Sequence, residues 1–169
     1  MSTAIIYSFS TNKTAKAAEK IIEAFGKGFE IKTVNAEDIT EKEFLSYDNL
    51  ILGVPTWFDG ELPYYWDEFI PALEDLDLKG KTVAIFGLGN QQGYSENFAD
   101  GVGILGRLIR ERGADLVGYT DNVKYTFDAS LALEDGKFMG LILDQENQAR
   151  LSKTRIEKWV DQLKKELKQ

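Results

Sequence analysis

Small polar side chains crowd one turn near the N-terminus, in the stretch IIYSFSTNKTAKAAEKII. An apolar run precedes this turn, and a helix-like pattern follows it. The hydroxyl and amide side chains are those of Ser8, Ser10, Thr11, Asn12 and Thr14, with Lys13 among them. A strand, a donor-rich turn and a helix N-terminus together make an anion site, because the first helical amides lack acceptors. A plain Ser/Thr turn with one helix cap is the alternative, and the turn alone does not decide between them.

Neither common nucleotide signature is present in this turn. G-x-x-x-x-G-K-[ST] is absent, which excludes an NTPase loop, and G-x-G-x-x-G is absent, which leaves a dinucleotide fold without support. Two later loops carry aromatic residues instead, Trp57 and Phe58 in GVPTWFDGELP and Tyr94 in FGLGNQQGYSENF. These rings could simply cover the core from above. Together with the first turn, they suggest a site for a flat heteroaromatic phosphate.

Composition limits the chemistry that the chain can perform alone. The 169 residues include no cysteine and no histidine, so a thiol nucleophile and the commonest general base are both excluded. The net charge is −8, and no basic patch suited to nucleic acid is visible. No apolar run is long enough to span a bilayer, and no secretion signal is visible, so we expect a cytoplasmic protein.

Strand-like and helix-like segments alternate along the chain, without a linker or an internal repeat. Strands are expected at 3–7, 29–34, 49–55, 81–89 and 114–119, and helices at 12–25, 41–45, 64–76 with an interruption at Pro71, 97–112 and from about 151. This alternation predicts one domain with a parallel sheet covered on both faces. Ligands of such sheets bind at the carboxyl ends of the strands, which are the loops after Tyr7, Val54 and Phe86.

The chain resembles a flavodoxin of the long-chain type nearly from end to end. The pieces that carry the resemblance are STNKT, PTW…GELP, GLGNQQGYSENF and YTFDASLALEDGKFMGLILDQENQ, in that order. The resemblance implies a flavodoxin-like three-layer sandwich that forms a single domain over 1–169. Its five-stranded parallel sheet would have the order 2-1-3-4-5 and helices on both faces. The last strand would be split by a long loop.

The same resemblance implies a low-potential one-electron carrier that binds FMN non-covalently and needs no catalytic residue or metal. Carried over by position, the cofactor-binding residues are Ser8, Phe9, Ser10, Thr11, Asn12, Lys13, Thr14, Pro55, Thr56, Trp57, Phe58, Asp59, Gly60, Gly87, Leu88, Gly89, Asn90, Tyr94, Asn97, Phe98 and Asp144. The first seven form the phosphate loop. Trp57 and Tyr94 are the residues expected to stack on the flavin.

Three positions depart from the family pattern. Asn12 stands where Gly is usual, and we expect it to tolerate a left-handed backbone at modest cost. Phe9 replaces a Ser or Thr, which removes one hydroxyl from the phosphate. Asn90 replaces an Asp, which keeps an acceptor for a flavin N–H but removes a negative charge.

Two other functions stay open at this level. One is a flavodoxin-like FMN-dependent oxidoreductase acting on quinones or NAD(P)H, and the other is a binding module that has lost its flavin. For the carrier, we expect a monomer whose partners are basic-faced redox proteins, such as a flavodoxin reductase and an electron-acceptor enzyme, and neither nucleic acid nor membrane. The acidic residues expected to attract these partners are Asp59, Glu61, Asp67 and Glu68.

Overall fold

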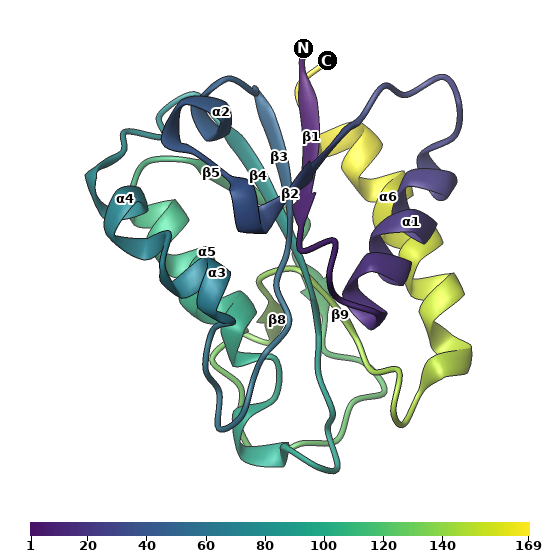
Figure 1. Cartoon of the computed structure of the whole chain (residues 1–169). Helices are drawn as coiled ribbons and strands as arrows, with labels where there is room; N and C mark the ends of the chain where they lie inside the picture. The colour runs from purple at the N-terminus through teal and green to yellow at the C-terminus, as the bar shows by residue number, and fades with distance from the viewer.

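A parallel β-sheet forms the centre of the computed structural model, which describes residues 1–169 (Figure 1). Its main strands are β1 Thr3–Tyr7, β2 Lys32–Asn35, β3 Asn49–Gly53, β4 Thr82–Leu88 and β5 Asp115–Val117. They lie in the order β2-β1-β3-β4-β5, and each neighbouring pair is parallel. The predicted strand order is confirmed.

The last strand of the sheet is split into two segments that pair with the same neighbour. β5 pairs with the first half of β4, and β9 (Leu141–Leu143) pairs with its second half. The chain between them forms a small antiparallel sheet from β6 Thr120–Asp121, β7 Leu133–Glu134 and β8 Lys137–Phe138, in the order β6-β8-β7. The segment that resembled the extra loop of long-chain flavodoxins is thus the insertion that divides the strand.

Helices cover both faces of the sheet (Figure 1). One face packs against α1 Lys13–Phe25 and α6 Ser152–Glu166. The other packs against α2 Glu41–Leu45, α3 Tyr64–Asp67, α4 Ile70–Asp75 and α5 Asp100–Glu111. Three short 3₁₀ helices lie in the connections, namely η1 Ala36–Asp38, η2 Ser95–Asn97 and η3 Ala149–Leu151.

Alternation along the strands divides the core into two layers. Ile6 packs into the core beneath α5, whereas Ile5 and Tyr7 pack into the core beneath α1 and α6. Every residue of β1 and β3 is buried, which is why these strands read as continuous apolar runs instead of alternating ones.

Two predicted elements begin three residues later than the sequence suggested. β2 starts at Lys32 because Phe29 belongs to the turn after α1, where its ring centroid lies 4.5 Å from that of Phe25. α5 starts at Asp100 because Ala99 adopts a left-handed conformation with φ of +54°. Each difference comes from local geometry at the element's end, which apolar periodicity does not record.

The helix expected at 64–76 is interrupted before Pro71. α3 ends at Asp67 and α4 begins at Ile70, so Pro71 lies in the first turn of α4. A proline is tolerated there because the N–H that it lacks would have no intrahelical acceptor.

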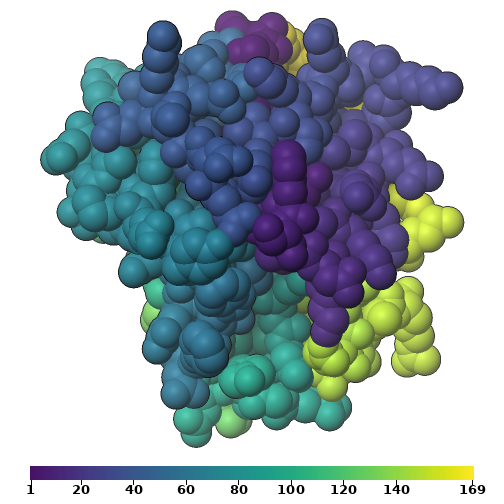
Figure 2. Space-filling view, viewed as in Figure 1, coloured from purple at the N-terminus to yellow at the C-terminus, as the bar shows by residue number.

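The chain termini meet at the edge of the sheet opposite the carboxyl ends of the strands. The buried Asn49 side chain donates to the Lys168 carbonyl at 2.9 Å and accepts from the Lys168 amide at 2.9 Å. Figure 2 shows the purple N-terminal and yellow C-terminal atoms together at the top of the molecule.

No helix combines the length and the apolar character needed to cross a bilayer.

Gly140 permits the close approach of the insertion to the main sheet. A Cβ added there would lie 2.1 Å from the carbonyl oxygen of Ile85 in β4. We expect Gly140→Ala to lower the free energy of unfolding by about 1–3 kcal/mol, because the backbone must shift to relieve the overlap. Gly28→Ala is the control, since nothing lies within 4 Å of its added Cβ. Urea unfolding measures both, and equal stabilities would show that β9 can move away at no cost.

Candidate functional site

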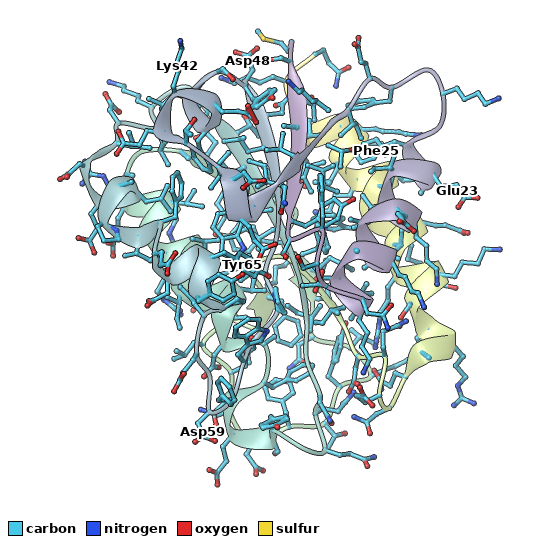
Figure 3. All side chains as sticks on the ribbon, in the orientation of Figure 1. Glu23, Phe25, Lys42, Asp48, Asp59 and Tyr65 are labelled. Carbon is cyan, nitrogen blue, oxygen red and sulfur yellow. The ribbon has the colours of Figure 1, made fainter.

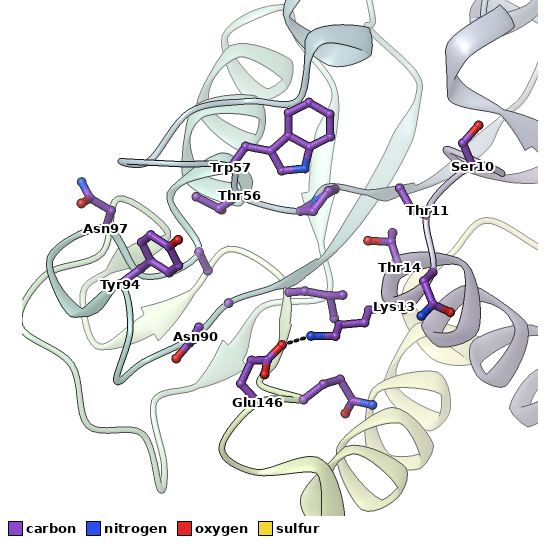
Figure 4. Close-up of a pocket in the computed structure, with 16 residues that line it drawn as sticks. Ser10, Thr11, Lys13, Thr14, Thr56, Trp57, Asn90, Tyr94, Asn97 and Glu146 are labelled. Atoms are coloured by element: carbon purple, nitrogen blue, oxygen red, sulfur yellow. Dashed lines mark ion pairs between the residues drawn. The ribbon is translucent and has the colours of Figure 1, made fainter.

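The loops that follow β1, β3, β4 and β9 enclose a cleft of about 530 Å³ at the carboxyl edge of the sheet (Figure 4). The residues that line it are Ser10, Thr11, Asn12, Lys13, Thr14, Pro55, Thr56, Trp57, Leu88, Gly89, Asn90, Tyr94, Asn97, Ala99, Gln145 and Glu146. All but Ala99, Gln145 and Glu146 were predicted as cofactor-binding residues. The structure therefore brings side chains from four separate loops into one concave surface.

The N-terminus of α1 forms one end of the cleft, and no side chain caps it. The first amide near this end with a helical acceptor is that of Lys16, which donates to the Asn12 carbonyl at 3.1 Å. The amides before it are left without an intrahelical partner by helix geometry. Asn12 has φ −93° and ψ −62°, so the left-handed backbone expected there is not adopted. The replacement of glycine at this position therefore costs nothing in backbone strain.

The hydroxyl groups of the first loop do not all point toward the cleft. Ser10 donates to Glu37 at 2.8 Å, and Thr11 donates to the Ser8 carbonyl at 2.7 Å. Each hydroxyl has a single hydrogen, so neither is a free donor in this arrangement. Thr14 is 2% exposed and lies on the cleft wall, and its hydroxyl has no partner within the protein. The donors directed at the cleft are thus the α1 amides and Thr14.

Glu37 joins the first loop to α3. One carboxylate oxygen accepts from Ser10, and the other accepts from the Tyr64 hydroxyl. The hydrogen bond from Tyr64, followed by that from Ser10, holds the pKa of the Glu37 carboxyl below its usual range. The loop is fixed further by Asn35, whose side chain accepts from the amides of Phe9 and Glu37, at 3.2 Å each.

Trp57 forms one aromatic side of the cleft and is held by a short hairpin. Its amide and carbonyl exchange hydrogen bonds with those of Glu61, at 2.8 and 2.7 Å. The ring packs against Tyr64 at 5.8 Å and against the buried Tyr65 at 6.1 Å between centroids. Phe58 at the turn of the hairpin has φ of +48°, a left-handed conformation that costs a non-glycine residue about 1–2 kcal/mol.

Tyr94 lies on the loop after β4 and is 50% exposed. The loop rests on the Phe98 ring, and a Cβ added at Gly89 would lie 2.6 Å from that ring. Asn90 accepts hydrogen bonds through Oδ1 from the Gly93 amide and from Asn147 Nδ2, both at 2.8 Å. The acceptor that the sequence assigned to a flavin N–H is therefore already used to hold the loop.

Several predicted residues lie beside the cleft rather than on its wall, and these are Ser8, Phe9, Phe58, Asp59, Gly60, Gly87, Phe98 and Asp144. The buried Phe98 stacks on Phe127, with 5.0 Å between centroids, and so anchors the insertion. Phe9 is half exposed, and its ring packs on that of Tyr7, with 5.2 Å between centroids. Phe98 and Phe9 therefore pack beside the loops that carry the cleft residues.

Asp144 was predicted to contact the cofactor, but it does not line the cleft. It is completely buried, and its carboxylate accepts from the Gln91 amide at 3.0 Å and from Gln91 Nε2 at 2.8 Å. It also accepts from the amide and side chain of Asn147, at 3.0 and 2.9 Å. A carboxylate enclosed in this way ties the loops after β4 and β9 together and does not face the cleft.

Sequence reasoning missed the part of the cleft that follows β9. Gln145 and Glu146 lie there, and Glu146 forms an ion pair with Lys13 across the cleft (Figure 4). The rule that ligands bind at the carboxyl ends of parallel strands would have included them. They were missed because Asp144 was the only residue of the loop after β9 that the family pattern assigned to the cofactor.

Known proteins resemble this chain in sequence and in architecture. Residues 5–159 match the family model for flavodoxins. A flavodoxin of Nostoc sp. strain PCC 7120 is 43% identical over 165 residues, which cover 96% of this chain and 95% of the relative. Flavodoxin 1 of Escherichia coli K12 is 41% identical over 167 residues, which cover 98% and 94%. The crystal structure of Fusobacterium nucleatum flavodoxin bound to flavin mononucleotide has a TM-score of 0.92 at 36% identity, covering 99% of each chain.

The role of Asp144 can be measured without any ligand. Asp144→Ala leaves the buried donors of Gln91 and Asn147 without an acceptor, so we expect the free energy of unfolding to fall by about 3 kcal/mol. Asp121→Ala is the control, because its side chain is 71% exposed and its pairing with Lys137 contributes little. Urea unfolding of the flavin-free protein gives both values. An Asp144→Ala variant as stable as the unmodified protein would mean that the carboxylate does not hold these loops.

Proposed function

The chain belongs to the flavodoxin family, and we propose that its cleft binds FMN so that the protein acts as a low-potential one-electron carrier. One observation supports this most strongly. An uncapped helix N-terminus and two aromatic side chains from separate loops line the same cleft. Flavodoxins are electron-transfer proteins rather than enzymes, so the oxidoreductase alternative has no support. The similar Fusobacterium nucleatum flavodoxin binds flavin mononucleotide, which speaks against the flavin-free alternative.

The cleft residues fit an aromatic ring system that carries a phosphate. The α1 amides and the Thr14 hydroxyl supply donors for a phosphate, and the helix dipole favours its charge. Trp57 and Tyr94 supply apolar surfaces for ring faces and exclude water from them. The Thr56 side chain is fixed in the cleft wall because its hydroxyl accepts a hydrogen bond from the Gly101 amide at 2.9 Å.

FMN, when bound, supplies the one-electron chemistry that this chain's own side chains lack. The protein contributes a rigid pocket whose supporting groups, including Phe98 and Asp144, are completely buried. The chain carries a net charge of −8, and Asp59 and Glu61 lie on the hairpin that holds Trp57. Negative charge at this end disfavours the addition of an electron, which is why we propose a low potential.

The partners of a flavodoxin are other redox proteins. For this chain we propose partners with basic faces, among them a flavodoxin reductase and an acceptor enzyme, which dock where Asp59, Glu61, Asp67 and Glu68 are exposed. Asp59 lies toward the end of the molecule opposite Asp48 (Figure 3). We further propose that residues 1–169 form one domain, that the carrier is monomeric, and that it works in the cytoplasm.

The phosphate end of the cleft can be tested by comparing two flavins. We expect FMN to bind far more tightly than riboflavin, because each charge-assisted hydrogen bond to the phosphate contributes about 1.5–3 kcal/mol. Thr14→Ala should weaken FMN about tenfold and leave riboflavin unchanged. Thr11→Ala should affect FMN less, because its hydroxyl donates to Ser8. Calorimetry gives all the affinities, and equal binding of FMN and riboflavin by the unmodified protein would refute the proposed site.

Docking of a basic partner predicts a strong dependence on salt. Stopped-flow reduction by a flavodoxin reductase should slow as salt rises, because charges are screened beyond about 8 Å at physiological ionic strength. Asp67→Lys with Glu68→Lys should slow reduction further at low salt. Glu23→Lys with Glu30→Lys makes the same change of charge at exposed residues on and just after α1, and should have less effect. Rates that are insensitive to salt and to the first pair would place docking elsewhere.

A further inference from the structure

Lys13 and Glu146 are the one cation and the one carboxylate among the residues that line the cleft, and they are paired with each other. Figure 4 shows this ion pair joining the first turn of α1 to the loop after β9. The two side chains are about half exposed, at 51% and 47%. The only positive side chain at the phosphate end of the cleft is therefore neutralised by the protein itself.

The residues on either side of Glu146 in the chain are held by hydrogen bonds. Gln145 accepts a hydrogen bond from Ser152 at the start of α6, and the Asn147 amide donates to the buried Asp144 at 3.0 Å. Asn147 also donates to Asn90 in the loop after β4 at 2.8 Å. The backbone on both sides of Glu146 is thus fixed, whereas Lys13 has a long flexible side chain. Lys13 can therefore swing toward an anion at the N-terminus of α1, whereas the backbone that carries Glu146 stays in place.

We propose that Glu146 is a specificity-determining residue that competes with the ligand's phosphate for Lys13. This inference rests on the proposed function, because it concerns the phosphate that the N-terminus of α1 would bind. A half-exposed ion pair contributes little to stability, so an incoming phosphate can break it easily. While the pair persists, Lys13 gives the phosphate no net attraction. We call this ion pair a latch. A phosphate monoester breaks the pair, whereas the uncharged end of riboflavin leaves it intact.

The latch predicts a non-additive pair of substitutions. Glu146→Gln frees Lys13, so the dissociation constant of FMN should fall about fivefold, and that of riboflavin should not change. In a Lys13→Met background the same substitution should change FMN affinity less than twofold, because no cation is left to release. Flavin fluorescence quenching at low salt measures these constants. Inorganic phosphate should likewise compete against FMN at lower concentration in Glu146→Gln than in the unmodified protein.

Glu157→Gln is the matched control for the loss of one negative charge. Glu157 pairs with Lys153 at 3.9 Å on α6 and lies outside the cleft, so its removal should leave FMN affinity unchanged. Equal gains from Glu146→Gln with and without Lys13 would overturn the latch, because simple repulsion would then explain them. Weaker FMN binding in Glu146→Gln would also overturn it, because Glu146 would then orient Lys13 toward the phosphate. Equal binding of FMN and riboflavin by the unmodified protein would instead refute the proposed function.

Discussion

The binding chemistry of the cleft depends on the unsatisfied amides at the N-terminus of α1. Helix geometry leaves the first amides without partners, and here neither Asn12 nor any other side chain caps them. Such a helix end is stable only where solvent or an anion can reach it, and the carboxyl edge of the sheet provides that access. β1 delivers the chain to this edge, and β3, β4 and β9 deliver the loops that surround it. The binding chemistry therefore follows from the direction of the parallel strands.

The loops keep their shape because side chains from neighbouring elements bind them together, and two of these, Asp144 and Phe98, are completely buried. Asp144 binds the loops after β4 and β9 to each other, and Phe98 binds the loop after β4 to the insertion through Phe127. Glu37 connects the first loop to α3 and so to the residues that pack on Trp57. Electron transfer benefits from such rigidity, because a pocket that does not rearrange costs little each time the charge of its ligand changes.

Much of this arrangement could be predicted from the sequence. Apolar runs located the strands, and the hydroxyl-rich turn located the helix end that lies in the cleft. Side-chain direction could not be predicted in the same way. Asn90 and Asp144 looked alike as polar residues near strand ends, yet Asn90 lines the cleft while Asp144 is completely buried. Ser10 and Thr14 are both hydroxyl residues of one turn, but only tertiary contact with Glu37 decides that Ser10 points away.

The central claim is that the α1 amides hold the ligand's phosphate, and backbone NMR tests it most directly. In ¹⁵N–¹H spectra, the amides of residues 12–15 should move strongly downfield when FMN is added, because charge-assisted hydrogen bonds form at those protons. Riboflavin should shift the amides near Trp57 and Tyr94 but leave residues 12–15 almost unchanged. If FMN binds and these four amides do not move, the phosphate lies elsewhere and the account is wrong.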